Sequence, residues 1–185
     1  KAWIIILLIF LALIFLRFFQ LEARTEFRWD QVDNAWAVKD ILIDHKLPLV
    51  GMQAKQNSGF FIGPAYYYLI VPFYAFFNLD PIAAGVIAGV TSIVTFFTIF
   101  YITKKLFSLP VAIIAIFLYT FSFEVIFADR YQWPINLIPT TSFIIFYALY
   151  NSILGKVRHL LLLGLALGFS FSLNFTSIFF PIIVL

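Results

Sequence analysis

Two carboxylates in the segment Trp29-Asp-Gln-Val-Asp33 are the side chains of this chain best placed to do chemistry. They follow the first apolar stretch, so Asp30 is expected at a membrane surface, where it can meet a lipid-linked substrate and a water-soluble one. A carboxylate in that place can act as a general base, and an ionisable group near an apolar boundary marks a candidate site because it is costly. The alternative is structural: Asp30 also suits a helix cap, with Asp33 in the first turn.

A basic side chain near this carboxylate would allow a phosphorylated substrate to bind, and the sequence offers several. Arg130 lies in a short polar segment between two apolar stretches, and guanidinium groups bind phosphate oxygens well. Lys55, Arg24 and Arg28 compete for the same role. The alternative for the segment around Arg130 is an interfacial turn in which Pro134 starts a helix. We expect Arg130 or Lys55 to contact the phosphate.

Aromatic and amide side chains are expected to line the same site. The run from 57 to 68 combines glycines, Pro64 and three successive tyrosines, of which Tyr66 and Tyr67 are candidates for contact with a polar headgroup. The alternative for most of these tyrosines is an anchor at the membrane interface, where amphipathic rings are common. Further candidate ligands of the substrate are Trp133, Asn136 and Asp33.

The amino-acid composition indicates whether the chain is soluble or lies in a membrane. Hydrophobic residues make up 63% of the 185 residues, charged residues only 11%, and the mean hydropathy is +1.02. Soluble domains are about a quarter charged, so the chain is predicted to be an integral membrane protein. The net charge of +3 is too small to indicate nucleic-acid binding. The absence of cysteine excludes disulfides and cysteine-based zinc sites. The two histidines lack metal-ligand spacing, so no cofactor is required, although a divalent metal is compatible with the sequence.

Five apolar segments are predicted to be membrane helices, and the first four have about the 20 residues that cross a bilayer core. They cover residues 2–19, 82–103, 109–128, 134–153 and 159–174. The predicted fold is therefore all-α, a polytopic bundle of transmembrane helices. The chain opens without Met and ends within a further apolar run, which predicts that it is the amino-terminal part of a longer protein.

Residues 20–80 form a single outer loop if the aromatic segment 64–79 lies at the interface and does not cross. All nine acidic residues then fall on one side of the membrane and five cations on the other, as the positive-inside rule requires. Residues 31–46 are predicted to form a second interfacial helix, with three aspartates on one face and apolar side chains opposite. The cations on the inner side would be Lys1, Lys104, Lys105, Lys156 and Arg158.

In order and spacing, these elements resemble the GT-C superfamily of membrane glycosyltransferases, in particular the branch of protein O-mannosyltransferases and aminoarabinose transferases. The matching pieces are WDQVDNAWAVKDIL, LPLVG, GPAYYYLIVPF and RYQWPINLIP, and the resemblance covers nearly the whole chain. It implies that Asp30 is the catalytic aspartate and that 64–79 is the juxtamembrane helix. The chain departs from the family at Gln31, where an acid often follows the catalytic aspartate, and at Ile62 and Gly63, where some members carry a basic residue.

The resemblance also implies an activity. Such enzymes move a sugar from a polyprenyl-phosphate carrier to an acceptor at the outer membrane face, usually with inversion at the anomeric carbon. The expected setting is the plasma membrane of a prokaryotic cell envelope, and the acceptor is a protein, a lipid or a glycan. Two other functions fit the same features. One is a transporter or flippase for lipid-linked saccharides, which would need polar residues deep in several spans, and the other is a non-catalytic membrane subunit.

Overall fold

The computed structural model describes residues 1–53 and 58–184 of the chain. Within these ranges the regular structure is helical, apart from one isolated antiparallel bridge between Gln53 and Phe61. The all-α class expected from the sequence is confirmed. The elements are α1 (Ala2–Phe18), α2 (Leu21–Arg24), α3 (Trp29–Leu42), α4 (Ala65–Phe76), α5 (Ile82–Leu106), α6 (Leu109–Phe121), α7 (Phe123–Ala128), the 3-10 helix η1 (Pro134–Leu137), α8 (Ile138–Ile153), α9 (Arg158–Leu173), the 3-10 helix η2 (Phe175–Ile178) and α10 (Phe179–Val184).

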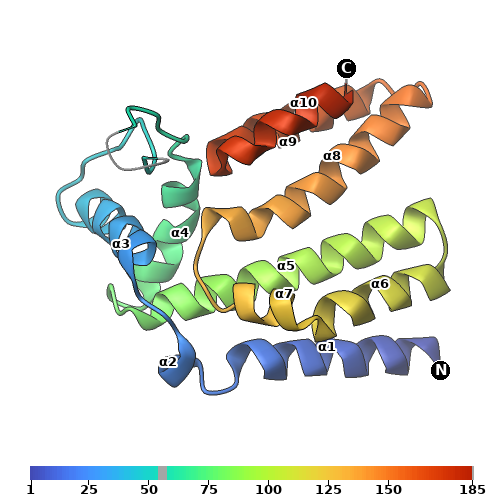
Figure 1. Cartoon of the computed structure of the whole chain (residues 1–185), viewed down its shortest axis with the longest axis horizontal. Coiled ribbons are helices and arrows are strands. Elements are labelled where there is room, and N and C mark those ends of the chain that lie inside the picture. Colours follow the sequence, from blue (N-terminus) through green and yellow to red (C-terminus); the bar gives the residue numbers. More distant parts are fainter. Residues whose placement is uncertain (54–57, 185) are drawn as a thin grey trace.

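The longer helices form a bundle, and two shorter helices lie across one of its ends (Figure 1). Helices α1, α5, α6, α8 and α9 run side by side, with α5 packed against α1, α6 and α8, and α8 packed against α9. At one end α3 packs against α4, and α4 in turn contacts α5 and α9. The amino terminus lies at the opposite end. Helices α3 and α4 occupy the two segments that the sequence predicted as interfacial helices.

The backbone conformation of two residues separates successive helices of the bundle. Helix α6 stops at Phe121 because Ser122 has an extended backbone (φ −64°, ψ 122°), and α7 starts directly after it. Gly155, with a φ of +80°, makes the tight turn between α8 and α9, a conformation that glycine adopts without steric cost. The single helix predicted over 109–128 is therefore two helices, and the one predicted over 134–153 is η1 followed by α8.

Three hydrophobic cores hold these helices together. The first joins α1, α5 and α6 around the fully buried side chains of Leu13, Phe96 and Ile116. The second joins α3, α4, α5 and the end of α9, with Val38 and Ile70 completely inaccessible to solvent. The third lies between α8 and α9. Apolar packing of the second core therefore fixes α3 and α4 on the end of the bundle.

Large apolar side chains also cover the outward faces of the bundle helices. Helix α5 is the one helix of the described residues that is long and apolar enough by itself to cross a membrane. Helices α1, α4, α6 and α9 are apolar but shorter. The exposed apolar side chains of α1 include Trp3, Leu7, Leu8, Leu11 and Phe15.

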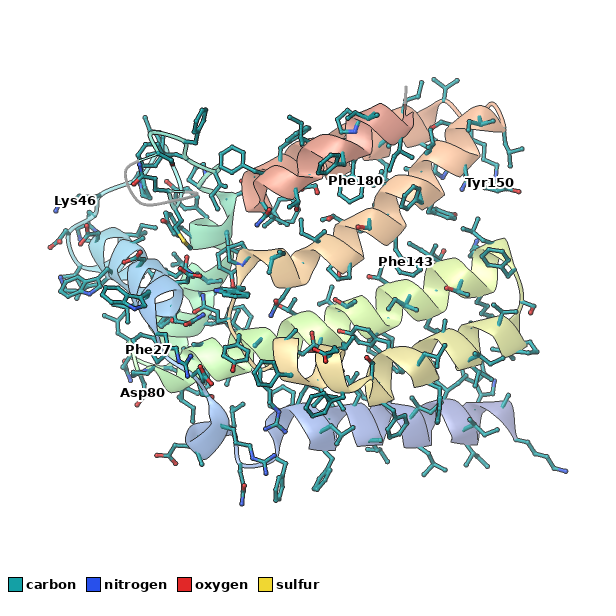
Figure 2. The ribbon with its side chains drawn as sticks, in the orientation of Figure 1. Phe27, Lys46, Asp80, Phe143, Tyr150 and Phe180 are labelled. Atoms are coloured by element: carbon teal, nitrogen blue, oxygen red, sulfur yellow. The ribbon has the colours of Figure 1, made fainter. Side chains whose placement is uncertain are left out.

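The charged residues divide between the two ends of the bundle, whose side chains are drawn in Figure 2. One end, which we name the basic end, holds the start of α1, the end of α5 and the turn between α8 and α9. All nine acidic residues lie in segments 22–80 and 124–129, toward the other end, which we name the acidic end. The basic end carries Lys1, Lys104, Lys105, Lys156 and Arg158.

Candidate functional site

A partly open cavity of about 360 Å³ lies at the acidic end of the bundle. Four segments that are distant in the sequence enclose it: the start of α3, the loop before α4, η1, and the junction between α9 and η2. Two residues predicted for the site, Asp30 and Trp133, both line this cavity. Among the described residues, the other polar side chains in its wall are Gln53 and Asn174.

Asp30 stands in the first turn of α3, where its side chain is partly exposed. The helix begins at Trp29, and Arg28 occupies the N-cap position. The side-chain oxygen of Gln31 accepts a hydrogen bond from the backbone N–H of Arg28 at 3.0 Å, so Gln31, and not Asp30, satisfies the helix start. The cap role that the local sequence also allowed for Asp30 is therefore wrong. Within the described residues the Asp30 carboxylate has no hydrogen bond or ion pair, which leaves it able to accept a proton from a ligand.

The loop before α4 forms a second wall of the cavity. Its two arms are joined by backbone hydrogen bonds from Gly51 N–H to the Ile62 oxygen at 2.8 Å and from Ile62 N–H to the Met52 oxygen at 3.0 Å. A Cβ atom at Gly51 would collide with the carbonyl oxygen of Gly63, so this close approach requires glycine. Lys55, one of the two predicted phosphate ligands, lies in 54–57, outside the described residues.

Asn174 lines the cavity although its sequence position does not predict this. It ends α9 and starts η2, where its side-chain oxygen accepts hydrogen bonds from the backbone N–H and the hydroxyl of Thr176, both at 2.9 Å. These bonds orient the amide at the rim of the Asp30 cavity. The available signal was its place at the outer end of the predicted segment 159–174, but the sequence gives no sign that this end meets the start of α3.

Tyr66 and Tyr67 point into the protein and not into the cavity. Their exposed fractions are 2% and 8%, and both belong to the face of α4 that is buried. Burial raises the pKa of each phenol, and the nearby charge of Asp33 adds to the rise at Tyr67. Asp33 itself is exposed on α3. The structure therefore does not bring these three predicted ligands to the cavity.

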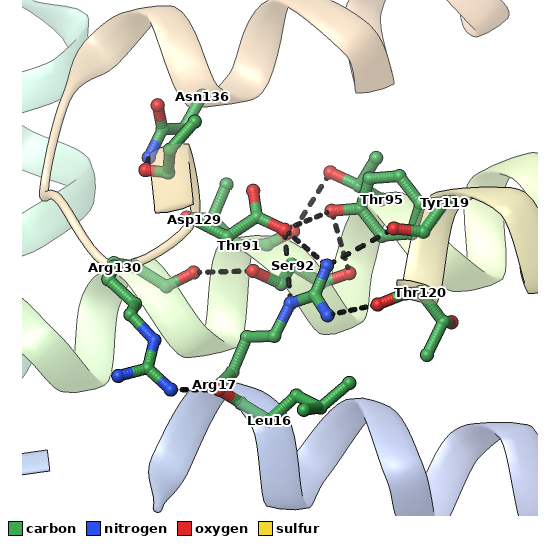
Figure 3. A network of polar contacts seen from close by, with 12 residues as sticks. Leu16, Arg17, Thr91, Ser92, Thr95, Tyr119, Thr120, Asp129, Arg130 and Asn136 are labelled. Carbon is green, nitrogen blue, oxygen red and sulfur yellow. Dashed lines mark hydrogen bonds and ion pairs between the residues drawn. The ribbon is translucent and has the colours of Figure 1, made fainter. Parts of the chain in front are cut away.

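Arg130 and Asn136 do not line the cavity, and Arg130 lies next to the end of α1 (Figure 3). Arg130 donates from Nη2 to the backbone oxygen of Leu16. Burial, followed by the charges of Arg24 and Arg17, lowers the pKa of Arg130. Asn136 donates from Nδ2 to the backbone oxygens of the last residue of α7 and of one residue in the turn that follows. Both side chains hold the turn in place, and the cavity wall described by the structure contains neither.

A buried ion pair lies beside this turn, between Arg17 of α1 and Asp129 (Figure 3). Arg17 donates from Nε and Nη2 to Asp129 Oδ2 at 3.2 and 3.0 Å, and Tyr119 donates its hydroxyl to the same oxygen at 3.0 Å. Arg17 also donates to the backbone oxygen of Thr120 at 2.6 Å, one of the carbonyls left unpaired at the end of α6. Arg17 therefore joins the end of α6 to Asp129 and has a structural role.

Comparisons with protein-family models, with curated proteins and with solved structures find no match to this chain. Across the described residues, no group of three or more acidic or histidine side chains lies close enough together to hold a metal ion. The case for a function therefore depends on the cavity itself. It contains a carboxylate without a partner among the described residues, two aromatic rings and two amides, at the end of an apolar bundle.

Proposed function

We propose that the chain is a polytopic membrane protein whose acidic end faces outward. The apolar side chains on the outward faces of the bundle helices support this, because contiguous exposed apolar surface is characteristic of contact with another apolar phase. All nine acidic residues lie toward one end, and the other end carries five cations and no acid, which agrees with the positive-inside rule. Joined end to end, α6 with α7 and η1 with α8 cover 109–128 and 134–153, which is about the length a bilayer core requires.

We further propose that this protein is a glycosyltransferase that uses a polyprenyl-phosphate sugar and that Asp30 is its general base. The observation that carries the proposal is that Asp30 lines a cavity at the acidic end, at the level where α3 and α4 cover the bundle. Trp133 supplies an aromatic wall to the same cavity. A lipid-linked donor would reach this place from the bilayer and a polar acceptor from water.

The reaction follows from one carboxylate and a phosphate leaving group. Asp30 takes the proton of the acceptor hydroxyl as the acceptor oxygen forms a bond to the anomeric carbon of the sugar. The bond from that carbon to the phosphate oxygen breaks, and the lipid phosphate leaves with the electron pair, which inverts the anomeric configuration. A second carboxylic acid is unnecessary because the phosphate needs no protonation to leave, whereas a cation would stabilise its charge. Lys55 is our candidate for that cation, since Arg130 is bonded to α1.

A transporter of lipid-linked saccharides is the less favoured alternative. It would need polar groups along a continuous path through the bundle, and the buried polar residues of α5 are hydroxyls. Two of these hydroxyls are bonded: Ser92 donates to a backbone oxygen of its own helix at 3.1 Å, and Thr95 bonds to the Thr91 oxygen at 2.9 Å and to Thr140 of α8 at 2.7 Å. Such bonds join helices and leave no free polar path among the groups that make them.

Sugar transfer by an Asp30→Asn variant tests the proposed function. The assay supplies membranes containing the protein with a panel of polyprenyl phosphates that carry radiolabelled hexoses or pentoses, and follows label released from the carrier. We expect at least roughly a 100-fold loss of transfer, the range of general-base catalysis. Asp40→Asn is the matched control, because it makes the same chemical change on the same helix outside the cavity. Full activity of Asp30→Asn, or no transfer with any donor of the panel, would contradict the proposal.

A further inference from the structure

The side chain of Gln31, next to Asp30, both accepts and donates a hydrogen bond. Its exposed fraction is only 2%. On one side its Oε1 accepts the backbone N–H of Arg28 at 3.0 Å, and on the other its Nε2 donates to the backbone oxygen of Gln132 at 2.9 Å. That oxygen belongs to the peptide bond that links Gln132 to Trp133. A single side chain therefore joins the start of α3, which carries Asp30, to the residue that supplies the aromatic wall of the cavity.

The connection continues from Gln132 into α4. Gln132 is 1% exposed, and its Oε1 accepts the hydroxyl of Tyr74 at 3.0 Å. Tyr74 is completely buried on α4, within the core that holds α3 and α4 on the bundle. The series of bonds from Arg28 through Gln31 and Gln132 to Tyr74 thus joins the start of α3, the segment before η1 and α4. We name it the amide strap.

Only a side chain that both donates and accepts can complete the strap at position 31. The primary amide of glutamine has one acceptor oxygen and two N–H donors, whereas an ionised carboxylate can only accept. A glutamate here could still accept the N–H of Arg28, but its second oxygen would face the carbonyl oxygen of Gln132 in a buried place. An unpaired buried charge beside a carbonyl is strongly unfavourable. The neutral residue at this position is therefore matched to the geometry.

We propose that Gln31 is a positioning residue, which fixes the Asp30 carboxylate relative to the Trp133 wall through its bond to Gln132. This inference rests on the proposed function, in which Asp30 must meet an acceptor hydroxyl inside the cavity. A small displacement of a reacting group can cost about 100-fold in rate. Gln31 does not touch the substrate, so its effect passes entirely through the placement of its neighbours.

The pH dependence of a Gln31→Glu variant tests this role. A protonated carboxylic acid has an O–H that can donate to the Gln132 oxygen, and burial raises the pKa of a glutamic acid above its ordinary value. As the pH rises from 5 to 8.5 this group ionises and the donor is lost. We therefore expect the ratio of variant to wild-type transfer rate to fall with pH, to about one tenth or less at the alkaline end.

Two further variants separate positioning from a general effect of charge or size. Gln20→Glu makes the same charge change at an exposed position just after α1, and we expect its rate ratio to stay near one at every pH. Gln31→Met removes both bonds without adding a charge, and we expect a reduced rate that does not vary with pH relative to wild type. A pH-independent ratio for Gln31→Glu, or a wild-type rate for Gln31→Met, would overturn the inference.

Thermal unfolding of the same variants distinguishes failure of the strap from failure of the proposed function. If the strap exists, the melting temperature of Gln31→Glu falls relative to wild type as the pH rises, whether or not the protein transfers sugar. That result in a protein without transfer would reject the proposed function and keep the strap. A melting temperature that follows the wild type across the pH range would reject the strap, even where transfer depends on Asp30.

Discussion

Asp30 and Asp129 are two carboxylates of the acidic end with opposite surroundings. Asp129 is buried, and its Oδ2 accepts hydrogen bonds from Arg17 and Tyr119. Asp30 is partly exposed, lines a cavity, and has no partner among the described residues. A carboxylate whose oxygens are occupied by permanent donors stabilises the fold, whereas one that faces a cavity is available to a ligand. The difference lies in the partners and not in the residue type.

The largest effect expected from this comparison is on stability, at the Asp129 side. Arg17→Met removes the cation and leaves a buried carboxylate without its charge partner. Breaking a buried pair in this way costs about 3–5 kcal/mol of unfolding free energy, measured by denaturant unfolding of the protein in detergent micelles. Arg24→Met is the control, because Arg24 is exposed. A change below about 0.5 kcal/mol for Arg17→Met, the range of ordinary surface substitutions, would show that the pair does not hold the turn.

A double variant of the ion pair is expected to lose less unfolding free energy than Arg17→Met alone. Arg17→Met combined with Asp129→Leu removes both charges, so no unpaired buried charge remains and much of the loss should be recovered. A residual loss of roughly 2 kcal/mol is expected, because the carbonyl of Thr120 at the end of α6 loses its donor. A double variant less stable than Arg17→Met alone would contradict this account of the ion pair.

The smallest expected effect on stability is at the Tyr74 hydroxyl, the last hydrogen-bond donor of the amide strap. Tyr74→Phe removes the donor to Gln132 Oε1, and a single buried hydrogen bond contributes about 1 kcal/mol to the free energy of unfolding. Tyr68→Phe is the matched control, since the hydroxyl of Tyr68 bonds to Pro48 at an exposed position. Equal losses for the two variants would mean that burial of the Tyr74 bond has no consequence.

The helices of this protein could be predicted from the sequence because each depends on a local apolar run. The segments 2–19, 82–103 and 159–174 match α1, α5 and α9 closely. The break at Ser122 could not be predicted, since nothing in the apolar run 109–128 marks it. Arg17 supplies the missing donors there from α1, and that contact joins residues far apart in the chain.

The candidate site was predicted less completely, for a similar reason. Asp30 and Trp133 were identified because acids and aromatic rings at the ends of apolar segments stand out locally, and both line the cavity. Tyr66 was expected there for its residue type alone, but the orientation of α4 on the bundle decides which of its faces is buried. Arg130 likewise bonds to α1, a neighbour that local sequence cannot reveal.

The most direct test of the central claim measures sugar transfer and unfolding in parallel for Asp30→Asn and Asp129→Asn. For Asp30→Asn we expect transfer to fall at least about 100-fold, with an unfolding midpoint equal to that of the wild type. For Asp129→Asn we expect a lower unfolding midpoint, because the ion pair with Arg17 is lost. An Asp30→Asn protein that transfers sugar at the wild-type rate would contradict the assignment of Asp30 as the general base.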